Sequence, residues 1–219
     1  SVNGGTDGLT VTASDKDASY AGGAIGQGTG GEVRKTSVTN LNSASAVKRA
    51  GGFAGYFGSG TLANVGGINL LGLKLLKIDG LLSVGQMIET FTVDSIVSGI
   101  SAGFTVGTSD ESGISGGFIG ECISGRARNT KISNLKSVTA SETSGKAGGF
   151  VGYAKAGDAL ANAGDSVPSS GLPAGIEIEN LLGVVSALRP EFNNTSIDYV
   201  SAGKDPQVSA DMAGGFVGD

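Results

Sequence analysis

Carboxylates are the side chains of this chain best suited to chemistry, and they are scattered. The 219 residues include 20 Asp and Glu, one Cys and no His, so the commonest general base and metal ligand are both missing. Glycoside hydrolysis needs two carboxyl groups about 5 to 9.5 Å apart, and no motif brings two acids together. The acids in question are Asp94, Asp110, Glu111, Glu121 and Asp198. We therefore expect no catalytic site, with a polysaccharide lyase or hydrolase as the alternative function.

Composition also argues against several other kinds of site. The single Cys122 forms neither an internal disulfide nor a CxxC metal site. No EF-hand loop or calcium-binding tandem repeat occurs, so we expect no cofactor and no metal. With 15 Lys and Arg against 20 Asp and Glu, the chain lacks the dense basic surface that nucleic acid requires. The longest apolar run, 68–84, is too short and too often interrupted by charges to insert into a membrane.

A glycine-rich heptapeptide, AGGFVGY in its copy from Ala147, recurs along the chain. The first glycines of its copies are Gly22, Gly51, Gly116, Gly148 and Gly214, in steps of 29, 65, 32 and 66 residues. We interpret the long steps as double steps of about 33 residues. Degenerate copies are then expected near the midpoints, at Ile78 and Ile178. Matching residues at offsets of about 100 predict a super-repeat of three coils, over 35–129 and 130–219.

The local patterns predict strands and no helices. Short aliphatic runs are bounded by Gly, Asn, Ser and Asp, and glycine interrupts nearly every window in which a helical stripe would develop. A period of about 32 residues favours a single right-handed parallel β-helix of about seven coils. Tandem β-sandwich domains are the alternative fold. The proline-containing segments 157–175 and 189–212 are predicted to be excursion loops.

In such a stack the same residue of each coil lies about 4.8 Å above its predecessor, so identical side chains form ladders. An interior aromatic column is expected from Phe53, Phe118, Phe150 and Phe216. The recurring motifs VTNL, ISNL and IENL predict an asparagine ladder of Asn40, Asn134 and Asn180. Independent side-chain turns at these asparagines are the alternative.

One position of the repeat is predicted to face outward. Glu121 stands where the other copies have Tyr56, Tyr153 and Asp219. Because an exposed tyrosine stacks on sugars and on protein side chains, Tyr56, Tyr153 and Glu121 are the candidate binding residues. Tyrosines that merely cover the edge of a coil are the alternative. The basic cluster within 126–131 is expected to be a solvated turn.

The GGFVG core, followed by strands such as TKISNLKSVTA, resembles the glycine-rich GLUG-type repeats of large bacterial surface proteins and adhesins. Phenylalanine stands here where that motif usually has leucine. The resemblance implies a non-enzymatic, extracellular or cell-surface β-helical segment, used for adhesion to a host glycan or protein or as a rigid stalk. Because the chain ends at Asp219, directly after a copy of the repeat, we expect further repeats of the same chain.

Overall fold

The computed structural model describes residues 1–58, 90–156, 189–200 and 207–219, and within these ranges the protein is all-β. No helix in the described ranges is long and apolar enough to span a membrane. The strands are β1 (Val2–Asn3), β2 (Leu9–Ala13), β3 (Tyr20–Gly22), β4 (Ile25–Thr29), β5 (Gly31–Arg34), β6 (Ser37–Ala46), β7 (Arg49–Gly51), β8 (Ala54–Gly58), β9 (Thr90–Val93), β10 (Ile96–Gly99), β11 (Phe104–Thr108), β12 (Ile114–Gly116), β13 (Ile119–Ile123), β14 (Arg126–Thr139), β15 (Lys146–Gly148), β16 (Val151–Lys155), β17 (Glu191–Tyr199), β18 (Gln207–Ser209) and β19 (Met212–Gly214).

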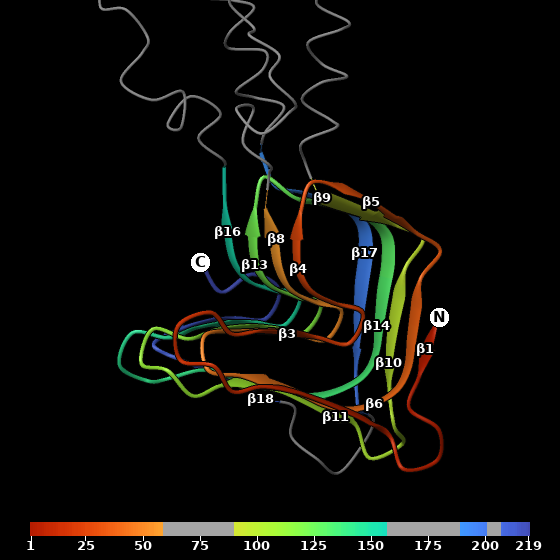
Figure 1. Ribbon diagram of the computed structural model, residues 1–219, viewed down its shortest axis with the longest axis horizontal. Coiled ribbons are helices and arrows are strands. Elements are labelled where there is room, and N and C mark those ends of the chain that lie inside the picture. Colours follow the sequence, from red (N-terminus) through yellow and green to blue (C-terminus); the bar gives the residue numbers. More distant parts are fainter. Residues whose placement is uncertain (59–89, 157–188, 201–206) are drawn as a thin grey trace, which may run out of the picture.

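These strands form three sheets, and the strands that pair within each sheet are parallel. Sheet A contains β1, β2, β5, β6, β9, β10, β11, β14, β17 and β18. Sheet B contains β3, β7, β12, β15 and β19, and sheet C contains β4, β8, β13 and β16. The chain runs along sheet A, returns along sheet B and then turns upward into sheet C, as Figure 1 shows. Each sheet is therefore built from successive passes of the chain.

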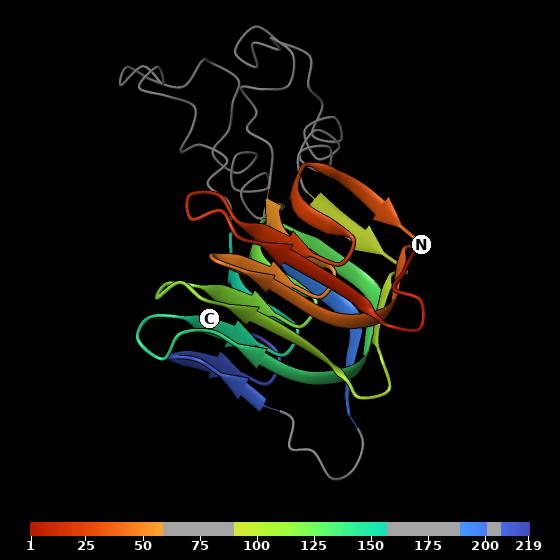
Figure 2. The ribbon, with the colours of Figure 1, turned by 60° about the horizontal axis from the view of Figure 1, so that its bottom comes forward.

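Copies of the heptapeptide lie beside one another in sheet B. The pairs in register are Ala21 with Ala50, Ala50 with Ser115, Ser115 with Ala147, and Ala147 with Ala213. Figure 2 shows these five strands in colour order from red to blue. Two of the four pairs span the long steps of the sequence. The interpretation of those steps as double steps is therefore wrong, and the described strands make five passes where about seven coils were expected.

The error has a physical origin. An insertion about as long as one coil produces the same residue spacing as a hidden copy of the repeat, so spacing alone does not separate the two. The long steps include 59–89 and 157–188, which lie outside the described residues together with the copies expected at Ile78 and Ile178. Ala50 and Ala147 are two strand steps apart in sheet B, where three coils were expected. The division into 35–129 and 130–219 stays a prediction.

The prediction of an excursion loop over 189–212 is also wrong for residues 189–200 and 207–212, which the structure describes. Strand β17 pairs with β14, and β18 pairs with a later part of β14. Pro190 directly precedes β17, a position where proline removes no ladder hydrogen bond from the strand interior. This proline thus marks a strand start. The other expected loop, 157–175, lies outside the described residues.

The core between the sheets includes aliphatic columns in strand register. Sheet A supplies two of them: Val11, Ala44, Val106, Val138 and Val208, and then Val38, Val97, Ile132 and Ile197. The members from the middle passes are fully buried, and burying such a side chain contributes about 1.5 to 3 kcal/mol. These columns hold the passes in one register and so fix the side chains that each turn displays.

Paired glycines make the turn from sheet B to sheet C. A Cβ added to Gly116 would lie 1.8 Å from the carbonyl oxygen of Ile119, three residues later. A Cβ added to Gly117 would lie 2.0 Å from the carbonyl oxygen of Gly149 in the next pass. Only glycine permits such a close approach of backbone to backbone. The repeat motif is therefore a steric requirement of this turn.

Candidate functional site

The inner side of the turn carries an aromatic column. The rings of Phe53, Phe118, Phe150 and Phe216 stack in that order, with centroids 4.7, 5.0 and 4.9 Å apart and planes within 5° of parallel. The first three side chains are fully buried, whereas Phe216 in the last pass is 37% exposed. The structure thus brings together the four phenylalanines that the sequence placed in one column. Each such pair contributes about 0.5 to 1.5 kcal/mol beyond area burial.

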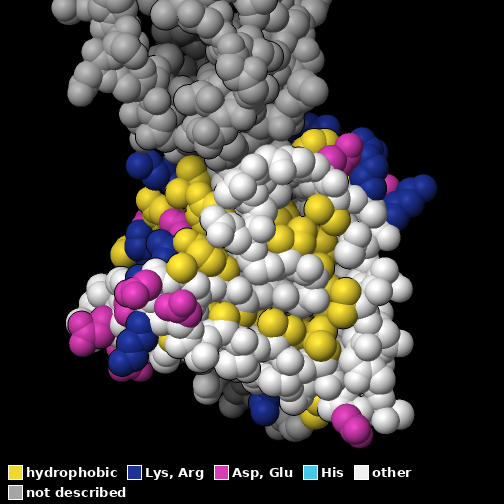
Figure 3. Space-filling model, viewed as in Figure 1, with side chains coloured by type: hydrophobic (Ala, Val, Ile, Leu, Met, Phe, Trp, Pro, Cys, Tyr) yellow, Lys and Arg dark blue, Asp and Glu magenta, His cyan; other side chains and the backbone are white. Residues whose placement is uncertain are grey.

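The outer side of the same turn carries two columns of mixed side chains. In sheet C, Gln27, Tyr56, Glu121 and Tyr153 are in register, and Asp219 continues the column. In sheet B, the facing column consists of Tyr20, Arg49, Ile114, Lys146 and Met212. We call these ten residues the corner. Hydrophobic, positive and negative side chains gather there at the left of Figure 3.

Glu121 lies at the centre of the corner and is only 6% exposed. Its carboxylate forms an ion pair with Nε of Arg49, which comes from the preceding pass. The neighbouring slots of the same column hold Tyr56 and Tyr153. The expectation that this slot faces solvent is therefore wrong for Glu121, which is buried between its register neighbours and paired with Arg49.

The two predicted tyrosines are half-buried, and each lies beside an aromatic or cationic partner. The ring centroid of Tyr56 is 5.7 Å from that of Tyr20, and the guanidinium of Arg49 is 5.9 Å from the Tyr20 centroid. Burial, and then the carboxylate of Glu121, raise the pKa of Tyr56 above its usual value. Nζ of Lys146 lies 3.9 Å from the ring centroid of Tyr153. The corner therefore combines aromatic rings with charged hydrogen-bonding groups.

Lys146 also forms an ion pair with Asp219, the exposed last slot of the sheet C column. Both ion pairs of the corner thus join a cation of sheet B to an acid of the sheet C column. Sequence reasoning missed Tyr20, Arg49 and Lys146. A signal was present, since each lies two residues before the first glycine of a repeat copy.

Comparison with known proteins identifies no relative of this chain. No protein-family model, no curated protein and no solved structure matches this chain. In the described ranges, no group of three or more His, Cys, Asp and Glu side chains could hold a metal ion. The function must therefore be argued from the residues of the chain.

The predicted asparagine ladder does not form between its two described members. Asn40 and Asn134 adopt left-handed backbone conformations, with φ of 56° and 61°. Nδ2 of Asn40 donates to Oδ1 of Asn3, whereas Nδ2 of Asn134 donates to the carbonyl oxygen of Gly99. These bonds join residues 37 and 35 positions apart, so they match neither the predicted ladder nor the alternative of independent side-chain turns. Asn180 lies outside the described residues.

A different polar ladder runs along a second turn, within sheet A. Nδ2 of Asn194 donates to Oδ1 of Asn129 at 2.8 Å, and Nδ2 of Asn129 donates to Oδ1 of Asp94 at 3.0 Å. All three residues have φ near 50°, as does Lys35 in the first pass. Sequence reasoning missed this ladder because its members differ in type. The shared signal is that each member precedes a serine or threonine.

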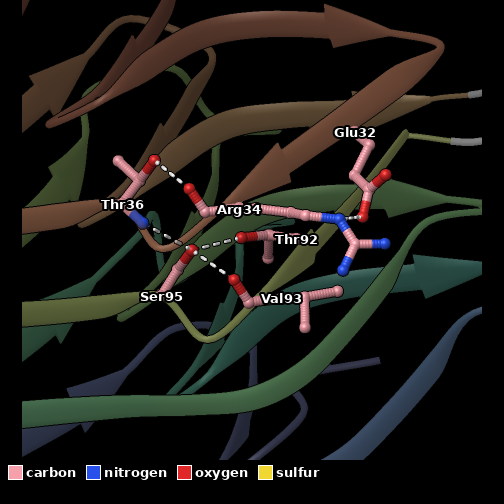
Figure 4. Close-up of polar contacts among 6 residues, drawn as sticks. All are labelled: Glu32, Arg34, Thr36, Thr92, Val93 and Ser95. Atoms are coloured by element: carbon pink, nitrogen blue, oxygen red, sulfur yellow. Dashed lines mark hydrogen bonds and ion pairs between the residues drawn. The ribbon is translucent and has the colours of Figure 1, made fainter.

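In the pass that contains Asp94, the following residue, Ser95, forms hydrogen bonds across this turn. Oγ of Ser95 accepts hydrogen bonds from Oγ1 of Thr92 at 2.7 Å and from the backbone N–H of Thr36 at 3.4 Å. It also donates to the carbonyl oxygen of Val93, as Figure 4 shows. In the same view, Glu32 forms an ion pair with Arg34. This turn holds successive passes together, and we assign no binding role to it.

The basic cluster expected as a solvated turn is part of a strand. Arg126 and Arg128 lie in β14 and contact Glu191 of the paired β17, at 3.6 and 3.1 Å. Burial alone would raise the pKa of Glu191, but the hydrogen bond and charge of Arg128 lower it below its usual value. Lys131 pairs with Asp198 at 2.7 Å. These charges bind neighbouring passes to each other.

Proposed function

We propose that this chain is a right-handed parallel β-helix that serves as a non-enzymatic adhesion module on the outside of a bacterial cell. Parallel pairing of every repeat copy supports the fold. Its handedness is supported by the course of the chain in Figure 1, which runs clockwise overall as it recedes from the N-terminal strands. The resemblance of the GGFVG core to repeats of bacterial surface proteins supports the location.

The observation that carries the binding proposal is the corner. Its three tyrosines, Tyr20, Tyr56 and Tyr153, lie beside Arg49 and Lys146 within two facing columns. Aromatic rings with nearby cations and carboxylates offer both an apolar contact and hydrogen bonds, which suits a glycan or a polar stretch of protein. Glu121 holds Arg49 in place through their ion pair.

The spacing of the corner favours an extended ligand. Tyr56 and Tyr153 are two strands apart in sheet C, which corresponds to roughly 10 Å at the usual strand spacing. A single sugar ring does not cover that distance, whereas a short oligosaccharide or an extended peptide does. Because both tyrosines project from paired strands, their separation is fixed before the ligand arrives, which lowers the entropic cost of binding.

A binding array of host glycans and host surface proteins tests the proposal. The double variant Tyr56→Leu, Tyr153→Leu removes both rings but retains apolar side chains, and we expect at least about a tenfold loss of affinity for any ligand of the wild type. The control is Lys131→Ala, whose ion pair with Asp198 is exposed on sheet A. It should bind as the wild type does. Thermal unfolding confirms that both variants fold.

Two outcomes would contradict the proposal. Wild-type protein that binds nothing on such an array would favour a passive stalk. Release of cleaved sugar products during incubation would favour the alternative of a carbohydrate-active enzyme.

A further inference from the structure

The charged side chains of the corner compensate one another. Arg49 pairs with Glu121 and Lys146 with Asp219, so the side chains of the corner include two positive and two negative ones and carry no net charge. A charged group of a ligand would lose its hydration beside these pairs without meeting an uncompensated charge of opposite sign. The charge balance of the corner therefore favours a ligand that has no charge of its own.

The ion pair with Glu121 leaves most of the hydrogen-bonding groups of Arg49 for other partners. Nε of Arg49 donates to the carboxylate, and the guanidinium has further N–H donors on its two Nη atoms, fixed in one plane. The side chain of Arg49 is 27% exposed, and its guanidinium lies 5.9 Å from the ring centroid of Tyr20. A planar set of donors beside an aromatic ring suits the closely spaced hydroxyl groups of a sugar.

The strands that carry the corner do not accept a peptide as an additional strand. Among the described strands, β7 and β12 pair on both sides within sheet B, and β8 and β13 pair on both sides within sheet C, so their backbone groups are already used in the ladders. A protein partner would instead need an apolar centre for its interface. Ile114, the aliphatic residue between Arg49 and Lys146 in the sheet B column, is only 7% exposed. These observations favour a glycan over a protein.

We propose that the ligand of the corner is an uncharged oligosaccharide whose chain crosses the strands from Tyr56 to Tyr153. This inference rests on the proposed function and names the class of ligand. One sugar ring contacts Tyr56 and receives hydrogen bonds from the Nη atoms of Arg49. Another contacts Tyr153, where Nζ of Lys146 lies 3.9 Å from the ring centroid and donates to the hydroxyl groups of that sugar.

The two tyrosines set a minimum length for this ligand. They lie two strands apart in sheet C, roughly 10 Å at the usual strand spacing, and the slot of Glu121 separates them. A monosaccharide therefore reaches one tyrosine, whereas a longer chain contacts both. Once one ring is bound, the second contact forms within the same complex, so the affinity should rise with chain length until both tyrosines are covered.

Calorimetric titration of the full chain with matched hexasaccharides tests the charge of the ligand. The uncharged probes are cellohexaose, mannohexaose, a linear N-acetyllactosamine hexasaccharide and the methyl ester of hexagalacturonate. The charged probes are the sialylated form of the N-acetyllactosamine chain and free hexagalacturonate. We expect at least one uncharged probe to bind, at least about tenfold more tightly than either charged probe.

The outcomes separate this inference from the proposed function. Binding of charged probes alone, or binding of host proteins but of no glycan, would overturn the inference and leave adhesion in place. A wild type that binds no glycan and no protein would contradict both. A monosaccharide that binds as tightly as the hexasaccharide built from it would also overturn the inference, because such a ligand needs only one of the two tyrosines.

Variants at the corner test which groups contact the ligand. Tyr56→Leu and Tyr153→Leu should each reduce the affinity for the hexasaccharide to nearly that for the monosaccharide, whereas Lys131→Ala should bind as the wild type does. Arg49→Lys keeps the charge and a partner for Glu121 but loses the planar fork, so we expect about a tenfold loss of affinity with an unchanged melting temperature. Wild-type affinity in Arg49→Lys, or a steep loss of affinity with added salt, would show that charge attraction holds the ligand and would contradict the proposal.

Discussion

On the inner side of the turn between sheets B and C, four passes place phenylalanine at one position, and the rings stack within 5° of parallel. On the outer side, only a few residues away, the corresponding column reads Gln27, Tyr56, Glu121, Tyr153 and Asp219. Both columns are held by the same strand pairing. They differ because the inner column belongs to the hydrophobic core, whereas the outer one lies outside that core, with its tyrosines half-buried.

The comparison shows that the fold requires particular residue types in the inner column and tolerates different ones in the outer column. Identical rings fill the interior at a constant strand spacing, and glycines give the backbone room to turn around them. On the outer side of the turn, side chains of different size and charge occupy equivalent positions, and they interact in pairs that differ from pass to pass. We therefore assign stability to the inner column, and our proposal places ligand binding at the corner.

Phe118→Ala should have the largest effect, because it removes a fully buried ring that stacks on two others. We expect the free energy of unfolding to fall by about 3 to 5 kcal/mol. Tyr153→Ala, at the half-buried outer column, should cost about 1 kcal/mol. Urea denaturation of both variants measures the comparison. Equal losses would show that the two columns do not differ as we describe.

Gly117→Ala should have the next largest effect, since its Cβ would lie 2.0 Å from a backbone carbonyl of the next pass. Overpacking of this kind costs about 1 to 3 kcal/mol. Gly215→Ala is the matched control at the equivalent position of the last described pass, where an added Cβ has nothing within 4 Å, and it should change the unfolding free energy by less than about 0.5 kcal/mol. Destabilisation by Gly215→Ala as large as that by Gly117→Ala would contradict the steric explanation.

Tyr56→Phe should have the smallest effect, visible only at high pH. Burial, followed by the carboxylate of Glu121, raises the pKa of Tyr56 in the folded protein, whereas an unfolded tyrosine has a pKa of about 10. The folded state therefore retains this proton more tightly, and the resulting stability is lost as the pH rises from about 10 through the folded pKa. Tyr56→Phe should lose less stability than the wild type over that range. Parallel melting-temperature profiles of the two proteins would contradict this prediction.

The sequence predicts the strands and the inner column well, because both follow local rules. Short aliphatic runs bounded by Gly, Asn, Ser and Asp form strands such as β2, and the heptapeptide copies mark the positions of the four stacked phenylalanines. The number of passes could not be predicted in this way. The sequence gives the number of residues between two copies of the repeat, and that number is the same whether those residues form another pass or an insertion.

The corner could be predicted only in part. Counting along the glycine strand identifies Tyr56, Glu121 and Tyr153 as one column, which the strand register reproduces. Their partners Arg49 and Lys146 belong to the preceding strand, across a turn whose direction is set by backbone contacts between passes. The burial of Glu121 follows from those contacts, so no property of its own sequence neighbourhood reveals it.

Disulfide trapping tests most directly whether copies of the repeat 65 residues apart are neighbours. In a Cys122→Ala background, the pair Tyr56→Cys, Glu121→Cys occupies adjacent strands, about 4.8 Å apart and within the range that a disulfide bridges. Mild oxidation should crosslink this pair, and also Glu121→Cys with Tyr153→Cys. Tyr56→Cys with Tyr153→Cys, two strands apart, should stay reduced. Failure of the 56–121 pair to crosslink while the 121–153 pair does so would contradict the account.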